Sequence, residues 1–250
     1  MAIKHVVLDW NGTLCDMTDD SAIMKRLAVA ALRGHLAAIK RGRVTRFANV
    51  MRFARGRVAL SVARGRFSAG EASLAELYAP FNQDMLVGTP LDRVRQVSAE
   101  YGRDHAHLID GRLLAPVLAA RETGATLTIF SAANESGVRG ILAAAGVAID
   151  DLICNRLESA NGNAVAFTAG HHTDKSGDFQ REILDARGWL PEETVYSGDT
   201  DVDEPIARML PAGNFIVPFL ASGPFRDRMR AEHGATTPEN AGDLSSLLSA

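Results

Sequence analysis

The sequence predicts an α/β fold: a three-layer, doubly wound parallel sheet with an α-helical domain inserted near its N-terminus. Three observations predict this fold. A short apolar segment at 4–8 predicts a buried strand, which ends before the turn-forming pair Asn11-Gly12. Residues 20–110 have the pattern of helices almost throughout. After residue 110, strands alternate with helices of about ten to fifteen residues, which is typical of a parallel sheet covered on both faces.

Glycines mark where the predicted helices of the C-terminal part end, at Gly124, Gly146 and Gly188. We expect these helices at 112–123, 135–145 and 175–187, and strands at 126–130, 194–197 and 216–218. In the helical stretch, Ser-Ala-Gly-Glu at 68–71 matches a capping box and predicts a helix start. The chain therefore divides into a core, residues 1–17 and 111–250, and an inserted helical domain, residues 18–110.

Composition is that of an ordinary globular protein, with 250 residues of which 46% are apolar and 23% are charged. No apolar run approaches the roughly 18 to 20 residues that a transmembrane helix requires. The N-terminal apolar run is too short for a signal peptide. The two cysteines, Cys15 and Cys154, have neither metal-ligand spacing nor a disulfide framework. A reducing cytoplasm is therefore the expected location.

The net charge of −3 conceals a strong asymmetry. Residues 25–66 hold two lysines, ten arginines and no acidic residue, so the rest of the chain carries a net charge of −15. This basic block indicates either a positive face over an anionic ligand or a set of solvated helix faces. The sequence leaves both interpretations open, and it does not indicate the oligomeric state.

Several polar residues follow the predicted strands or open a predicted helix. Asp9, Ser131 and Asp199 come after strands, Lys175 opens a helix, and Asp203 follows Asp199 by four residues. Ligands of open α/β sheets bind beyond the carboxyl ends of the strands, so these side chains are candidates for a shared site. Taken singly, each also has an ordinary explanation as a helix cap, a strand-end hydroxyl or an exposed charge.

In this order the residues resemble a known pattern. The stretch Asp9-Trp10-Asn11-Gly12-Thr13-Leu14, then Ser131, then Lys175, then Gly-Asp-Thr-Asp-Val-Asp at 198–203 resembles the four motifs of the haloacid-dehalogenase-like hydrolase superfamily. Residues 112–207 are most similar to its phosphoserine-phosphatase-like branch, including 151–158 and the turn at Asn161-Gly162. The resemblance implies a Rossmann-like core and makes residues 18–110 its helical cap domain.

The resemblance also implies a function: a Mg²⁺-dependent phosphatase that hydrolyses a small phosphorylated metabolite through an aspartyl-phosphate on Asp9. A divalent cation removes the repulsion between a carboxylate and a phosphate dianion, so the chemistry is consistent with these residues. The implied catalytic residues are Asp9, Asn11, Ser131 and Lys175. The implied phosphate-binding residues are Gly12, Thr13, Ser131 and Lys175. The implied metal site comprises Asp9, Asn11 through its backbone carbonyl, Asp199 and, through water or outer contacts, Asp203.

One position departs from the family pattern. Phosphatases of the superfamily usually carry a second aspartate where this chain has Asn11, and a carboxamide cannot transfer a proton. General acid–base help is worth about 10²–10⁴-fold, so the change matters. Three outcomes stay open: a substrate that needs little protonation, such as an acyl or enol phosphate; a persistent aspartyl-phosphate that is passed to an acceptor; or a proton from another group. The candidate groups are Asp16, Asp19, Asp20, His171 and His172.

Other enzymes of the same fold are alternatives. A dehalogenase would not need the acidic pair Asp199 and Asp203, which argues against it. A phosphonate hydrolase would need a cap lysine, and Lys25 and Lys40 are the candidates.

A catalytically weak binding or regulatory protein is an alternative from a different class. It would use the basic block to bind nucleic acid or anionic lipid. Residues 50–60 alternate bases with apolar residues, as helices that lie on a membrane surface do. Nucleic-acid binding is poorly supported, because the block has only Phe47, Phe53 and the adjacent Phe67 as aromatics for base stacking.

Overall fold

The computed structural model describes residues 2–18, 20–43, 46–71, 74–168 and 174–249. The six strands in these ranges form one sheet, in the order β4-β3-β2-β1-β5-β6. Their bounds are β1 (His5–Leu8), β2 (Thr126–Asn134), β3 (Asp151–Ala160), β4 (Asn163–Thr168), β5 (Thr194–Ser197) and β6 (Phe215–Ile216). All neighbours pair in parallel except β3 and β4. The predicted α/β fold is confirmed, with an antiparallel edge strand that the prediction of a parallel sheet did not include.

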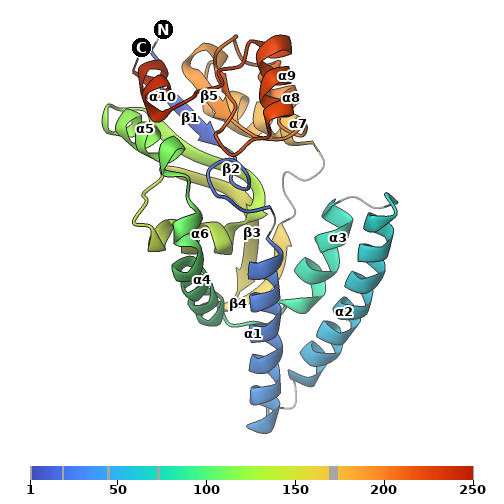
Figure 1. The fold of residues 1–250 in the computed structure, drawn as a ribbon. Coiled ribbons are helices and arrows are strands. Elements are labelled where there is room, and N and C mark those ends of the chain that lie inside the picture. The colour runs from blue at the N-terminus through green and yellow to red at the C-terminus, as the bar shows by residue number, and fades with distance from the viewer. Residues whose placement is uncertain (1, 19, 44–45, 72–73, 169–173, 250) are drawn as a thin grey trace.

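Strand β1 lies at the centre of the sheet, between β2 and β5 (Figure 1). His5 pairs with Thr126 on one side and Thr194 on the other, so both neighbours come from the C-terminal part of the chain. Strand β5 has the predicted bounds, and β2 continues beyond its predicted end at Phe130 to Asn134 through an irregular register. The carboxyl ends of β1 and β5 therefore lie side by side.

Helices cover both faces of this sheet (Figure 1). Successive side chains of β1 alternate between two hydrophobic clusters, with Val6 and Leu8 in one and Val7 in the other. The first cluster includes residues of α5 (Gly111–Glu122), α6 (Glu135–Ala144) and α10 (Ala241–Leu248). The second includes residues of α7 (Lys175–Phe179), the π-helical η4 (Gln180–Asp185), α8 (Glu204–Ala207) and α9 (Gly223–His233). A short 3-10 turn, η5 (Pro191–Glu193), precedes β5.

The segment between β1 and α5 is helical, as predicted. It comprises α1 (Ser21–Lys40), α2 (Phe47–Ser68), α3 (Leu74–Pro80), the π-helical η2 (Phe81–Met85), α4 (Leu91–His105) and the 3-10 turn η3 (Ala106–Leu108). Figure 1 shows α2 and α3 as a pair that stands apart from the sheet. No helix in the described residues is both long enough and apolar enough to cross a lipid bilayer.

Helix α4 packs closely against α6 of the core (Figure 1). The two backbones meet at glycines, because a Cβ atom on Gly102 would lie 1.9 Å from the carbonyl oxygen of Gly140. Only glycine allows so close an approach. The last helix of the inserted segment is thus in direct contact with the core, and the domain boundaries at residues 17 and 111 stay a prediction.

A β-hairpin connects the sheet to the inserted helices. Strands β3 and β4 are joined at Asn161 and Gly162, which both have positive φ, as the favoured two-residue hairpin turns require. The backbone nitrogen of Leu91 donates to the carbonyl oxygen of Gly162 (3.0 Å), and that of Gly88 donates to Ala164 (2.7 Å). The hairpin therefore holds the segment that leads into α4.

The predicted helix start at 68–71 is wrong. Ser68 is the last residue of α2, and Gly70 has a φ of +73°. The backbone nitrogen of Glu71 donates to the carbonyl oxygen of Arg66 at 2.8 Å, which is the hydrogen bond of a glycine-based helix C-cap. The glycine ends one helix here, and the Ser-x-x-Glu spacing does not begin the next.

Candidate active site

Asp9 immediately follows the central strand. Its backbone nitrogen donates to the carbonyl oxygen of Ser197 at 2.9 Å, which fixes the residue against the end of β5. The side chain is 8% exposed. Oδ2 lies 2.9 Å from Nζ of Lys175, while Oδ1 is buried and has no hydrogen-bond partner within the described part of the chain. One oxygen of Asp9 is therefore held by a cation, and the other is free to meet a ligand.

Lys175 is the first residue of α7 and is buried. The side chain of Asp174 caps this helix by accepting from the backbone nitrogen of Gly177 at 2.8 Å. Nζ of Lys175 lies between two carboxylates, 2.9 Å from Oδ2 of Asp9 and 2.5 Å from Oδ1 of Asp203. Burial alone would lower the pKa of Lys175, but the charges of Asp203 and Asp9 raise it above its ordinary value. The side chain is therefore a permanent cation.

Asp203 is fully buried, and both of its oxygens accept hydrogen bonds. Oδ1 accepts from Lys175 and from the hydroxyl of Tyr196 at 2.6 Å. Oδ2 accepts from the backbone nitrogen and the hydroxyl of Thr200, at 3.2 and 2.9 Å. Burial would raise the pKa of Asp203, but the charge of Lys175 and these donors lower it. Asp203 thus serves to hold Lys175 in place, and it has little capacity left for a direct bond to a metal.

Asp199 follows β5 and lies between solvent and the cluster. Its Oδ1 accepts from the hydroxyl of Thr13 at 2.9 Å, so the loop after β1 is joined to the loop after β5. Burial, followed by the charges of Asp9 and Asp203, raises the pKa of Asp199 to about 7. Burial and the neighbouring negative charges therefore disfavour the ionised form of this carboxylate.

Two glycines allow these loops to come together. Gly12 has a φ of +71°, and a Cβ atom there would lie 2.2 Å from Oδ2 of Asp199. A Cβ atom on Gly198 would lie 2.5 Å from Cγ of Asp203. Any side chain at either position would displace a carboxylate of the cluster, so glycine is required by close contact at both.

The cluster has the properties of a site for a small, hard dication. Carboxylate oxygens of Asp9, Asp199 and Asp203 all lie within 4.8 Å of one another. With Lys175 as the nearby cation, three carboxylates leave two net negative charges, which a divalent ion would balance. Buried oxygens without a partner also occur here, at Oδ1 of Asp9 and Oδ1 of Asn11. Oxygen donors of this kind suit Mg²⁺, so the residues present fit the ion.

The remaining predicted residues have varied positions. Ser131 lies within β2 and not after it. Burial raises the pKa of Asp9, and the adjoining hydroxyl of Ser131 partly opposes that rise. Asp16 is exposed, whereas Asp20 is buried and accepts a hydrogen bond from the backbone nitrogen of Asn134. The other candidates for a substitute acid, Asp19, His171 and His172, lie outside the described residues.

Sequence reasoning missed Tyr196 and Thr200, the hydrogen-bond donors that orient Asp203. A signal existed for Tyr196, because it lies in a predicted buried strand, and a buried tyrosine hydroxyl needs a partner. Phosphate binding by the backbone amides at Gly12 and Thr13 stays a prediction, and the hydroxyl of Thr13 bonds Asp199.

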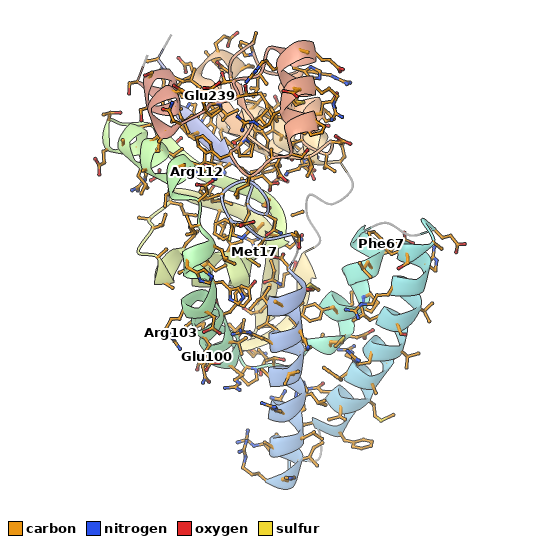
Figure 2. The ribbon with its side chains drawn as sticks, in the orientation of Figure 1. Met17, Phe67, Glu100, Arg103, Arg112 and Glu239 are labelled. Atoms are coloured by element: carbon orange, nitrogen blue, oxygen red, sulfur yellow. The ribbon has the colours of Figure 1, made fainter. Side chains whose placement is uncertain are left out.

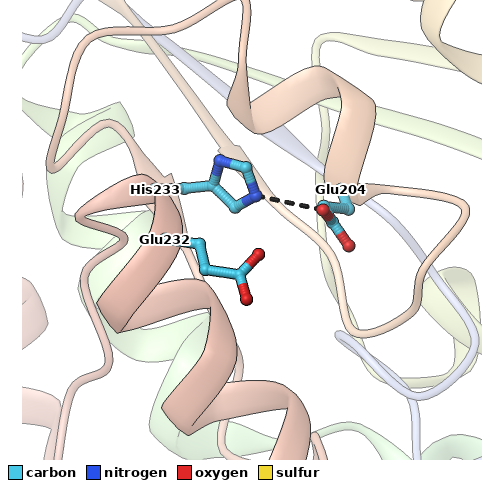
Figure 3. Close-up of side chains that lie close together, drawn as sticks. All are labelled: Glu204, Glu232 and His233. Atoms are coloured by element: carbon cyan, nitrogen blue, oxygen red, sulfur yellow. Dashed lines mark hydrogen bonds and ion pairs between the residues drawn. The ribbon is translucent and has the colours of Figure 1, made fainter.

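A second group of potential metal ligands lies between α8 and α9 (Figure 3). Glu204 of α8 approaches Glu232 and His233 of α9 there. Glu204 already pairs with His233 at 3.1 Å, with Arg208 at 2.9 Å and with Arg228 at 3.3 Å. Two arginines beside the carboxylate compete with a metal ion, so this group is an ion-pair network that fastens α9 to α8.

The sequence as a whole settles the family. Residues 6–208, well over half of the chain, match the family model described as haloacid dehalogenase-like hydrolase. The chain belongs to this family. The residues from Asp9 to Asp203 that the sequence analysis singled out lie within the matched range. No curated protein matches the chain in sequence.

Several solved structures are similar to this chain in fold. A protein of unknown function from Bordetella pertussis Tohama I has a TM-score of 0.62 at 16% identity, over 95% of this chain and 99% of that one. A family hydrolase from Salmonella enterica serovar Typhi has a TM-score of 0.58 at 14% identity, over 99% and 72%. A substrate-bound phosphoserine phosphatase has a TM-score of 0.56 at 13% identity, over 98% of both chains. At these identities, the likeness is one of fold.

Proposed function

We propose that this protein is a Mg²⁺-dependent phosphatase that hydrolyses a small phosphomonoester through an aspartyl-phosphate on Asp9. One observation carries the proposal: Asp9 has one oxygen bound to Lys175 and one without a hydrogen-bond partner among the described residues, and it lies within 4.8 Å of the Asp199 carboxylate. A nucleophile next to a fixed cation and an incomplete set of oxygen ligands is the arrangement that phosphoryl transfer needs. The fold shared with a phosphoserine phosphatase supports a phosphomonoester as substrate.

Each residue of the carboxylate cluster has a distinct role in the proposed reaction. Mg²⁺, when bound, would neutralise the repulsion between the Asp9 carboxylate and the phosphate dianion. Asp9, the backbone carbonyl of Asn11 and Asp199 would hold the ion. Asp203 acts through Lys175, because the oxygens of Asp203 already accept hydrogen bonds. Lys175 fixes the orientation of Asp9 and adds positive charge for a phosphoryl oxygen, and burial keeps competing water away from both.

Asn11 sets the rate of the second half of the reaction. Hydrolysis of an aspartyl-phosphate requires a base that takes a proton from the attacking water, and the leaving oxygen requires an acid in the first step. A carboxamide can do neither. We therefore expect good leaving groups to react fastest, and the covalent intermediate to break down slowly enough to accumulate.

A metal-dependent activity screen tests the proposal. Purified full-length protein is assayed against a panel of phosphomonoesters, with Mg²⁺ and after its removal by chelation, and activity is expected only with the metal. Asp9→Asn should lower turnover by at least about 10³-fold, as loss of a nucleophile does elsewhere. Asp92→Asn, the same change at an exposed position of α4, is the matched control and should retain activity. Absence of turnover on every ester, together with no binding of a phosphoryl mimic such as aluminium fluoride, would refute the proposal.

Phosphonate hydrolysis requires a separate test. Lys25 lines a groove of about 400 Å³ between α1 and α4, and Lys40 is the exposed last residue of α1. Borohydride treatment in the presence of an aldehyde substrate is expected to leave both lysines unmodified. A trapped adduct on either would identify a Schiff base and favour the phosphonate hydrolase.

A further inference from the structure

The outer face of α2 presents an apolar ridge to solvent. Phe47, Met51, Val58 and Val62 are 55–68% exposed and follow one another at spacings of four, seven and four residues. At 3.6 residues per turn, these spacings place all four on one side of the helix. The opposite side is the buried one, where Phe53, Gly56, Leu60 and Ala63 pack against the protein. The 22 residues of α2 make it about 33 Å long, and the ridge from Phe47 to Val62 covers about 22 Å of that length.

Arginines lie along both flanks of the ridge. On the helical wheel, Arg55 and Arg66 lie on one side of it and Arg57 and Arg64 on the other. The first two have acidic partners, since Arg55 pairs with Asp84 and Arg66 lies 3.5 Å from Glu76. Arg57 and Arg64 are exposed and have no ion pair with any described residue. The side of α2 between the ridge and the buried residues therefore carries uncompensated positive charge.

The same surface extends to the beginning of the helix. Lys40, Arg41 and Arg43 are exposed just before α2, near its most N-terminal apolar residue, Phe47. In Figure 1 this end of α2 and the end of α1 lie together at the tip of the molecule farthest from the sheet. Figure 2 shows Phe67 at the opposite end of α2, where it is 41% exposed but lies on the other side of the helix from the ridge. We name the surface that comprises the apolar ridge with Lys40, Arg41, Arg43, Arg57 and Arg64 the α2 face.

Charge complementarity selects the kind of partner. A second copy of this chain would bring two basic faces together, because residues 25–66 contain twelve bases and no acid. A nucleic acid would satisfy the arginines but would leave the aliphatic ridge exposed to water, since the ridge offers Met51, Val58 and Val62 where base stacking needs aromatics. An anionic bilayer satisfies both, because phosphate groups meet the arginines while apolar side chains enter the acyl boundary.

We propose that the α2 face is a docking surface for anionic lipid bilayers, on which α2 lies in the plane of the membrane. The apolar ridge inserts between the headgroups, and Arg57 and Arg64 contact lipid phosphates. The inference does not depend on the proposed function, because none of these residues belongs to the candidate active site.

Co-sedimentation of the full-length protein with vesicles tests the proposal. The protein is expected to sediment with vesicles of equimolar phosphatidylcholine and phosphatidylglycerol, to remain in solution with phosphatidylcholine alone, and to dissociate as salt is raised. The double variant Arg57→Gln/Arg64→Gln should weaken partitioning about tenfold or more, since each arginine near an anionic surface contributes about a factor of five. The double variant Met51→Ser/Val58→Ser should also weaken it about tenfold or more, because it removes apolar side chains that enter the acyl boundary. All four positions are exposed, and thermal unfolding by circular dichroism verifies that the variants fold.

Matched controls place the same changes elsewhere. Arg95→Gln/Arg139→Gln removes two exposed arginines from α4 and α6. Leu190→Ser removes an exposed apolar side chain from the surface of the sheet-containing domain. These variants should partition like the parent protein. Failure to sediment with the anionic vesicles would overturn the proposal, as would equal losses in the controls. A shift in mobility with single-stranded RNA that Met51→Ser/Val58→Ser leaves unchanged, without vesicle binding, would assign the surface to nucleic acid instead.

Discussion

The hydroxyl of Tyr196 donates a 2.6 Å hydrogen bond to Oδ1 of Asp203, in the core beneath the carboxylate cluster. The same oxygen accepts from Nζ of Lys175. Burial and the charge of Asp203 raise the pKa of Tyr196 well above its ordinary value, so the phenol remains a donor. The two donors keep the Asp203 carboxylate ionised and directed toward Lys175.

Replacing Tyr196 by Phe should destabilise the protein. The variant loses a hydrogen bond to a charged group, worth about 1.5–3 kcal/mol, while the ring can keep its contacts with Phe179 and Phe215. Urea unfolding measures the change. Tyr101→Phe is the control, because its hydroxyl donates to the sulfur of Met17, a weak acceptor, at 3.6 Å. Equal losses in the two variants would contradict a special role for the Asp203 contact.

Mg²⁺ should stabilise the protein more at about pH 8 than at about pH 6. The pKa of Asp199 is raised to about 7 in the metal-free protein, so below pH 7 the ion must displace a proton, whereas above pH 7 it does not. The raised pKa also means that the metal-free folded state binds more protons than the unfolded state between about pH 4 and 7. The contribution of Asp199 to the free energy of unfolding of the metal-free protein therefore falls as pH rises through that window.

Thermal unfolding with and without Mg²⁺ at the two pH values measures this effect. Asp199→Asn should abolish the dependence of the Mg²⁺-induced increase in Tm on pH. Asp201→Asn, a change at a neighbouring exposed residue, should preserve it. An increase in Tm of the same size at both pH values, in the parent protein, would show that Asp199 does not exchange a proton for the metal.

Gly12→Ala should remove the response to Mg²⁺. The new Cβ would lie 2.2 Å from Oδ2 of Asp199 and would force that carboxylate away from Asp9. Gly146→Ala is the matched control, because Gly146 also has a positive φ, +68°, but has open space around it. Both variants should lose about 1–2 kcal/mol of stability from the backbone conformation. Only Gly12→Ala should lose the Mg²⁺-dependent rise in Tm, and retention of that rise would contradict the close packing of Gly12 on Asp199.

Asn11→Asp should accelerate turnover of esters with poor leaving groups, by up to about 10²–10⁴-fold. The new carboxyl can protonate the leaving oxygen and then activate water. Rapid-quench kinetics should show an initial burst of product in the parent protein and none in the variant. Asn161→Asp, the same change in an exposed turn, is the control. An unchanged rate in Asn11→Asp would indicate that another group already supplies the proton.

Much of the core was predictable from the sequence because its strands are apolar and its helices end at glycines. Strand β5 has the predicted bounds, and Gly124, Gly146 and Gly188 all have positive φ. The β3–β4 hairpin was not predicted as strands, because residues such as Arg156 and Glu158 interrupt any apolar run. Only its turn at 161–162 gave a signal.

The candidate site was predictable to the extent that strand ends converge. Asp9 and Asp199 follow adjacent parallel strands, and the structure brings both near Asp203 and Lys175. The division of labour within the cluster could not be predicted, because it depends on hydrogen bonds across tight turns. The capture of both Asp203 oxygens by Lys175, Tyr196 and Thr200 is a property of side-chain packing that spacing does not encode.

The central position of β1 has a consequence for how the protein is made. This strand is synthesised long before its partners β2 and β5, so it must wait unpaired while local helices such as α1 and α2 form. Asp9 obtains its backbone anchor, Ser197, only when the C-terminal part of the chain has emerged. A nascent or truncated polypeptide that ends before β5 would therefore expose an unpaired hydrophobic strand. Such a strand is prone to aggregate, and chaperones bind exposed hydrophobic segments of this kind.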